Sequence, residues 1–531
     1  MNWLIAMVIL AQIDAPKAAE NVRATPVLTK VADPYDAAAW AVEDALALKL
    51  REQSAAGCLY LWIGPEEDPN VAKINSLAVN SALSHSSTIQ LPDLTAGGRL
   101  IRWDLAKLAP KAEDFKRLVG VINDLSIGEP YWHVDLKAIG LPPVKCDPFV
   151  HIDGKTYHAT FSTPAPATAD AYRILQRETG LKTPLMRADY FLRRISSTVQ
   201  GGHYYRARGF ITYDEKGKEK RLNEAEILQI LGASTAVSRR VRADDRVGIV
   251  RSDVTGQARA VEFIQGAVGP VRITYDRSGD NENVAAHPLY SLLDVVNKSD
   301  GRETIFELPN GLFGYIATNG KGELVDEVPA NIATNHRTPA PYPGRLYAAI
   351  GCVECHAANG GVQRTPNDVA RLLRDPKDLD AFADLTGTGF TAEDIDRLAG
   401  LYSGDFERRA KESRDRYGDA VFTATRGMTA AQAGAEWSRQ FHRYWFDMVN
   451  ADQQLLELGW KARSPQAANR ALTTLLEKTT IDAIINGQRI SREDPLIVAP
   501  RKGIAIRRQD QERIFAESFR RAYEHRHEVQ P

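Results

Sequence analysis

Apolar residues recur at helical spacing in the first third of the chain. From Pro34 to Ala56 the period is near 3.6 residues, which predicts an amphipathic helix. Two shorter helices are predicted over residues 71–84 and 111–121. Short apolar or alternating runs predict strands over Cys58–Ile63 and Arg99–Leu105. We therefore expect an α+β domain over residues 34–140.

The middle third is richer in predicted strands. An alternating run over Val150–Phe161 contains an Asp-Gly turn signal, and β-branched runs separated by Gly and Asp fill residues 247–275. Two further runs flank Pro309-Asn310-Gly311, which predicts a β-hairpin. A helix is predicted over residues 183–199. These patterns indicate a β-rich α+β domain over residues 141–328.

The last third, residues 329–531, is predicted to be mainly α-helical. It begins with a polar segment over residues 329–343 that carries four prolines, which is typical of a linker or loop. Helical patterns with charged outer faces follow, over residues 366–373, 391–401, 406–416, 430–458 and 509–523. The expected fold class is therefore α+β multidomain, with mixed α+β N-terminal and middle regions ahead of a helical C-terminal region.

The first residues have the pattern of an export signal. Trp3–Ala11 is an unbroken apolar run, long enough for a secretory signal and too short to span a bilayer. We expect a signal peptide over residues 1–15 and a flexible segment over residues 16–33. A buried first strand or helical turn is the alternative. No later stretch approaches ~18 consecutive apolar residues, so no transmembrane helix is expected.

Composition excludes several classes of protein. Of 531 residues, 44% are hydrophobic and 25% charged, the balance of a globular chain. The 67 basic and 68 acidic side chains give a net charge of −1, which argues against nucleic-acid partners and a polybasic membrane surface. Four cysteines are too few for a disulfide-stapled scaffold. Cys58 and Cys146 form either a disulfide or two free buried thiols.

The other two cysteines carry the clearest chemical signal. Gly351 is followed by Cys352-Val353-Glu354-Cys355-His356, the Cys-x-x-Cys-His pattern of covalent haem attachment. On one helical turn, two thiols reach the two vinyl groups on one edge of a porphyrin, and the imidazole lies beside them as an iron ligand. Because the pattern occurs once, we expect one covalently attached haem c.

Two other interpretations of the motif are weaker. A zinc ribbon needs a second ligand pair, and the only loose candidate, Cys146 with His151, lies in another predicted domain. A thioredoxin-like redox pair needs a strand and a helix around the motif, which the proline-rich approach does not supply. An export signal agrees with covalent haem, because bacteria attach haem outside the cytoplasmic membrane.

The sixth iron ligand is less strongly indicated. Only Met428 and Met448 follow the motif among the methionines. Met428 lies in a predicted loop just before a helix, where its thioether can bend toward iron, and it is the preferred candidate. Met448 shares a predicted helical face with Trp437 and other aromatic residues, which is typical of core packing. His442, on the adjacent face, is an alternative ligand or a buried histidine with partners.

Several segments resemble a set of large single-haem c-type cytochrome proteins of Gram-negative bacteria. The resemblance is carried by the segments Val79–Leu83, Leu100–Leu105, Arg187–Phe191, Phe306–Tyr315, Asn319–Asp326 and Gly351–His356. Proteins of this set have a long N-terminal region ahead of a late haem site. The resemblance implies haem binding through Cys352, Cys355 and His356, and electron transfer.

The expected function is that of a periplasmic c-type cytochrome that moves single electrons through one haem. Cys352 and Cys355 hold the porphyrin, His356 binds iron, and residues 329–531 form a cytochrome c-like domain. The long region before the motif would dock a redox partner protein. Because that region is far longer than an electron shuttle needs, a haem enzyme with an open distal site is the alternative. A gas-binding module is the third hypothesis.

Overall fold

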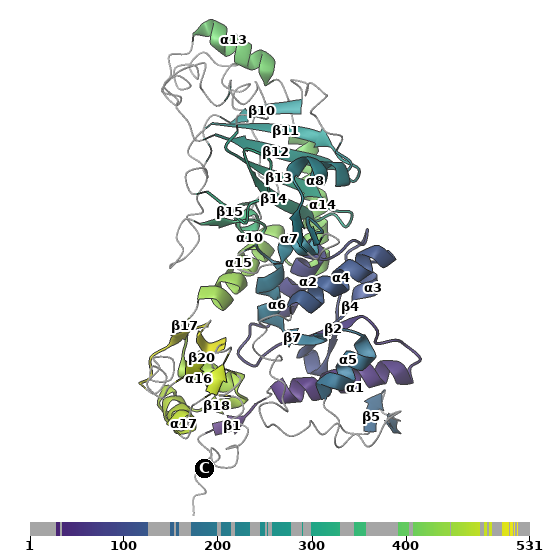
Figure 1. The fold of residues 1–531 in the computed structure, drawn as a ribbon, viewed down its shortest axis with the longest axis vertical. Helices are drawn as coiled ribbons and strands as arrows, with labels where there is room; N and C mark the ends of the chain where they lie inside the picture. The colour runs from purple at the N-terminus through teal and green to yellow at the C-terminus, as the bar shows by residue number, and fades with distance from the viewer. Residues whose placement is uncertain are drawn as a thin grey trace, which may run out of the picture.

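The structure is a computed structural model of the chain. It describes residues 28–31, 34–125, 149–152, 155–158, 171–198, 203–213, 218–233, 245–249, 252, 258–277, 289, 299–329, 345–356, 391–402, 407–446, 448–477, 483–485, 488–490, 502–508, 510–512, 515 and 518. Within these ranges the protein is a mixed α+β structure (Figure 1). No helix among them is both long enough and apolar enough to cross a membrane.

A four-stranded sheet organises the N-terminal part. Its order is β3-β4-β2-β7, with β2 antiparallel to β4 and parallel to β7. The strands are β2 (Cys58–Trp62), β3 (Asp93–Thr95), β4 (Leu100–Asp104) and β7 (Leu185–Arg187). Every residue of β2 is buried, because helices cover both faces of this sheet.

Alternate side chains of β2 enter two different hydrophobic cores, one on each face of the sheet. Leu59 and Leu61 point into a core shared with α2 and α6, whereas Tyr60 and Trp62 point into a core shared with α1 and α5. The helices around this sheet are α1 (Pro34–Leu50), α2 (Val71–Ala82), α3 (Leu105–Leu108), α4 (Ala112–Leu125), α5 (Ala171–Thr179) and α6 (Ala188–Ile195). In Figure 1, α1 and α5 lie on the opposite side of the sheet from α2 and α6.

A five-stranded antiparallel sheet organises the middle part. Its strands follow chain order, β10-β11-β12-β13-β14. They are β10 (Arg246–Ile249), β11 (Arg259–Gln265), β12 (Pro270–Asp276), β13 (Gly301–Glu307) and β14 (Phe313–Asn319). The predicted hairpin is confirmed between β13 and β14, where Gly311 takes the left-handed conformation, with φ of 85°, that favours glycine.

Different helices cover the two faces of this sheet. On one face Glu303 and Glu307 of β13 point toward α10 (Ile350–His356) and α14 (Glu407–Thr425). On the other face Arg302 reaches Glu224 of α8 (Glu224–Ile230), and Phe306 packs on Phe210 beyond α7 (Tyr204–Ala207). The motif helix α10 therefore rests directly on a sheet.

A long helix connects the two sheet regions. Helix α15 (Ala430–Phe446) contacts α2 and α6 of the N-terminal part and α10 and α14 near the five-stranded sheet. Figure 1 shows it running from α10 toward the C-terminal elements. Those elements are α16 (Ala451–Glu457), α17 (Pro465–Glu477), β17 (Met448–Val449), β18 (Trp460–Ala462), β19 (Ala483–Ile485), β20 (Gln488–Ile490) and β21 (Ile506–Arg507).

Small paired strands complete the described structure. Strand β1 (Leu28–Lys30), within the segment predicted to be flexible, pairs with β18, and β17 pairs with β21. The other pairs are β5 (Phe149–Ile152) with β6 (Lys155–His158), β8 (Ile211–Tyr213) with β9 (Glu219–Arg221), β15 (Glu327–Val328) with β16 (Leu346–Tyr347), and β19 with β20. The described residues also form η1 (Ala96–Gly98) and α13 (Ala392–Leu401).

Two predicted helices are wrong in part. The segment predicted as one helix over residues 183–199 begins with β7, because pairing with the distant β2 outweighs its local pattern. The helix predicted over residues 430–458 is interrupted after Phe446, and Asn450 caps a new helix by accepting a hydrogen bond from the Gln453 amide. The helix predicted over residues 366–373 and most of that over 509–523 lie outside the described residues.

Candidate haem attachment site

The Cys-x-x-Cys-His motif forms the short helix α10. Ala349 precedes it in the left-handed conformation, with φ of 68°, so the chain turns sharply into the helix. Cys352 and His356 are buried, with exposed fractions of 2% and 3%, and Cys355 is half-buried. The helix therefore directs the Cys352 and His356 side chains toward the interior of the protein.

Glu354, inside the motif, anchors α10 to α15. Its Oε1 accepts a hydrogen bond of 2.8 Å from the Ser438 hydroxyl and also contacts Nε2 of His442. His442 thus supports the back of the motif helix through Glu354. Of its two predicted roles, the geometry favours a histidine with a partner over the sixth ligand, although His442 is half-buried rather than buried.

The three motif side chains converge on one recess against the five-stranded sheet. Nε2 of His356 lies 3.3 Å from Oε1 of Glu303 on β13, and its ring stacks near Tyr315 with centroids 6.5 Å apart. We call this space the motif recess; its lining residues are Arg259, Asp276, Arg302, Glu303, Ala317, Val328, Leu346, Gly351, Cys352, Cys355 and His356.

Glu303 is the electrostatic centre of the motif recess. Burial alone would raise its pKa, but His356, Arg259 and Arg272 together hold the pKa well below its usual range. In contrast, burial and the nearby Glu303 carboxylate raise the pKa of the Cys352 thiol well above its usual value. Cys352 is therefore held as a neutral thiol in this arrangement.

Further buried charges surround Glu303. Arg259 forms a two-bond ion pair with Asp276, at 2.5 and 2.8 Å. Among the described residues, Nε and Nη1 of the buried Arg272 have no hydrogen-bond partner, and burial lowers the pKa of Arg272 to about 10. This face of the sheet therefore offers an incompletely paired cation next to Glu303.

The donor set fits a covalently attached haem. Two thiols and an imidazole line the same recess, and Nδ1 of His356 is buried without a partner in the described part of the chain. The cavity is about 20 Å³, room for one water and far less than a porphyrin. Haem binding therefore requires the recess to open. Iron binding through Nε2 of His356 would also require Glu303 to leave that nitrogen.

The arrangement argues against the two other interpretations of the motif. Within the described ranges, Cys352, Cys355 and His356 do not form a group of ligand atoms within 4.8 Å of one another, as a zinc centre requires. A thioredoxin-like pair needs a cysteine whose pKa is lowered, whereas that of Cys352 is raised.

The methionine candidates lie elsewhere. Met428, at the turn between α14 and α15, packs against the main core and is not among the described residues that line the motif recess. The prediction that Met448 lies on a buried helical face is wrong, because Met448 belongs to β17 and is 51% exposed.

The remaining cysteines are only partly described. Cys58 is buried in β2, where burial and Asp104 raise the pKa of its thiol to about 11. Cys146 lies outside the described residues, so the predicted choice between a disulfide and free thiols stays open.

Sequence reasoning missed the charged side chains that face the motif. Arg259, Arg272, Asp276 and Glu303 occupy positions that point to one face of buried strands. The sequence signal that could have revealed them is the presence of charged residues at strand positions expected to be apolar, because buried charges need partners or a function. Comparison with protein-family models, curated protein sequences and solved structures finds no match.

Proposed function

We propose that the protein is a monohaem c-type cytochrome that transfers single electrons through a covalently attached haem. The observation that carries the proposal is the convergence of Cys352, Cys355 and His356 on one recess. The two thiols would add across the porphyrin vinyl groups, and an imidazole nitrogen of His356 would bind the iron. The haem, when bound, would supply an iron that alternates between the ferric and ferrous states.

The residues around the motif have separate supporting roles in this proposal. The burial of Cys352 and His356 limits the access of water, which favours a higher reduction potential. Arg259 and Arg272 would balance the charge of Glu303 once His356 is engaged elsewhere. Glu354 would keep α10 in place through Ser438. These are positioning roles, because none of these side chains carries the electron.

The proposal extends to compartment, domain and partner. Because bacteria attach haem covalently outside the cytoplasmic membrane, we place the protein in the periplasm, exported by the apolar run over Trp3–Ala11. Residues 329–531 would form the cytochrome c-like part, with α10 packed on the five-stranded sheet as well as on α15. A redox partner protein would exchange electrons with the haem.

A second candidate function is that of a haem enzyme with an open sixth position. It is favoured by one observation: among the described residues, the motif recess contains no methionine and no histidine besides His356. An iron with one protein ligand can bind peroxide or another small molecule. Met428 stays the proposed sixth ligand for the electron-transfer function.

The test is expression of the full chain with a haem-maturation system, followed by denaturing electrophoresis and optical spectra. We expect haem to stay with the denatured wild-type protein. The amount of retained haem should fall strongly in Cys352→Ala and Cys355→Ala. It should not change in Cys58→Ala, the matched buried-cysteine control. His356→Ala should change the spectrum of any haem that remains. Folded wild-type protein without covalent haem would refute both candidate functions.

Carbon monoxide separates the two candidates. An unchanged reduced spectrum indicates a tightly held sixth ligand and supports electron transfer. If that ligand is Met428, Met428→Leu should make the spectrum respond to carbon monoxide, whereas His442→Asn should not. A large change in the wild-type spectrum instead supports the open-site enzyme and removes Met428 as the ligand.

A further inference from the structure

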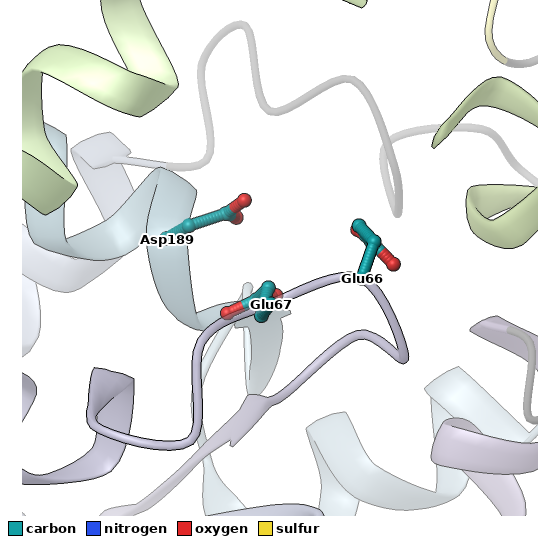
Figure 2. A group of neighbouring side chains, drawn as sticks. All are labelled: Glu66, Glu67 and Asp189. Atoms are coloured by element: carbon teal, nitrogen blue, oxygen red, sulfur yellow. The ribbon is translucent and has the colours of Figure 1, made fainter. Parts of the chain in front are cut away.

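A second group of titratable side chains, half-buried as whole residues, lies apart from the motif. Figure 2 shows Glu66 and Glu67 on the loop after β2 and Asp189 in the first turn of α6. One carboxylate oxygen from each lies within 4.8 Å of the others. They line a recess to which Gln440 and Tyr444 of α15 also contribute, and we call it the acidic recess.

Several oxygen atoms in the acidic recess lack hydrogen-bond donors. Oε2 of Glu66 and Oε2 of Glu67 accept no hydrogen bond from the described residues, although both side chains are only 4% exposed. Oε1 of Glu66 lies 2.7 Å from Nη2 of Arg187. Gln440 is 5% exposed; its amide nitrogen donates to Glu436, and its Oε1 is left without a donor. Buried oxygens of this kind need a donor or a cation.

The charge balance also leaves room for a cation. Arg187 lies 2.7 Å from Glu66 and 2.5 Å from Asp189, and it is shared with Glu67 at 3.7 Å. These three carboxylates thus share one guanidinium group, which Glu457 also approaches at 3.7 Å.

Other charges nearby do not remove this imbalance. Glu457 lies 3.7 Å from Arg187 and pairs with Arg508, while Asp68 pairs with Arg439. Arg443 donates a hydrogen bond of 2.7 Å to the main-chain oxygen of Glu66 rather than to a carboxylate. The side chains of Glu66 and Glu67 therefore keep oxygens that these arginines do not reach.

We propose that the acidic recess binds one calcium ion through Glu66, Glu67, Asp189 and the amide oxygen of Gln440. Carboxylate and amide oxygens are the ligands of hard divalent cations, and separations up to 4.8 Å suit Ca–O distances of roughly 2.3–2.6 Å. The cavity of about 30 Å³ has room for an ion with a water. Calcium is preferred to magnesium because it accepts irregular geometry.

The location suggests what bound calcium would do. The ligands come from the N-terminal sheet region and from α15, and α15 also holds the motif helix through Ser438 and Glu354. Calcium would therefore fasten the N-terminal region to the helix that supports α10. This inference does not depend on the haem, because none of the calcium ligands lines the motif recess.

The test is calorimetric titration of CaCl₂ into the chelator-treated full chain, with thermal unfolding alongside. We expect one saturable site per chain and a melting temperature that rises with calcium concentration. Glu67→Gln and Asp189→Asn should weaken binding about tenfold or more, since affinity depends on ligand charge. Asp415→Asn, which neutralises a 65% exposed carboxylate on α14, is the matched control and should bind like the wild type.

A second measurement covers the case in which a variant fails to fold. Terbium luminescence, excited through nearby Tyr444, should appear with the wild-type protein and fall as calcium displaces terbium; magnesium should compete less well. A folded wild-type protein without saturable calcium binding would overturn the proposal. Equal calcium affinity in the wild type and both folded acidic-recess variants would also overturn it.

Discussion

His85 shows how a single side chain can make stability depend on pH. Its Nε2 lies 3.1 Å from Nη2 of Arg117, and Arg208 is also close. Burial, Arg208 and Arg117 lower the pKa of His85 from 6.5 to about 3. The folded protein therefore binds fewer protons here than the unfolded chain between these two values, and stability falls as the pH falls through that window.

We predict that His85→Gln flattens this part of the pH dependence. Going from pH 6.5 toward pH 5, the wild type should lose up to about 1.4 kcal/mol of unfolding free energy per pH unit relative to the variant. Urea titrations of both proteins across this range would measure the difference. Parallel stability curves for the two proteins would show that His85 does not stay neutral in the fold.

At the scale of the element, the β13–β14 hairpin combines local and distant requirements. Gly314 is the cross-strand partner of Phe306, and a Cβ at Gly314 would lie 2.3 Å from Cζ of that ring. Phe306 cannot move aside easily, because it is buried and packs edge-on against Phe210. The close pairing therefore requires glycine for space, whereas Gly311 at the turn is required for its positive φ.

Gly314→Ala should destabilise the protein by about 1–3 kcal/mol through overpacking. Gly418 provides the matched control, because it lies inside α14 and no atom comes within 4 Å of a Cβ built there. Gly418→Ala should stabilise the fold by about 0.5–1 kcal/mol, since alanine favours helix interiors. Chemical denaturation compares the two variants; a neutral Gly314→Ala would contradict the close packing.

At the scale of the whole molecule, an N-terminal strand pairs with a strand of the C-terminal region. Strand β1 pairs with β18 over Leu28–Lys30, and the amide of Val31 donates to the Gly459 oxygen. The second core likewise combines α1 and β2 with Trp460 and other C-terminal residues. The C-terminal elements are therefore stabilised by residues more than 400 positions earlier.

Deleting residues 1–31 should expose β18, whereas deleting residues 1–24 should leave it paired. We expect faster amide hydrogen exchange at Trp460–Ala462 in the shorter protein, because its backbone groups lose their β1 partners. Exchange measured by mass spectrometry on both truncated proteins tests this. Equal protection in the two proteins would mean that β1 adds no stability to the C-terminal region.

Local patterns predicted much of the fold, and the candidate site only in part. The hairpin, β2, α2 and the strands over residues 247–275 follow from periodicity and turn residues, which act within a few positions. Strand β7 could not be predicted from local patterns, because its only described strand partner, β2, is more than 120 residues away in the sequence. The partners of the motif, above all Glu303, were missed for the same reason.

The sequence by itself determined that two thiols and an imidazole lie together on one short helix, because Cys352, Cys355 and His356 are separated by spacings that helix geometry keeps close. Only the tertiary structure decided what faces them. It placed Glu303 against His356, Glu354 against Ser438, and Glu66 with Asp189 around Arg187. Such pairings depend on burial, which brings charges from distant segments together and excludes water.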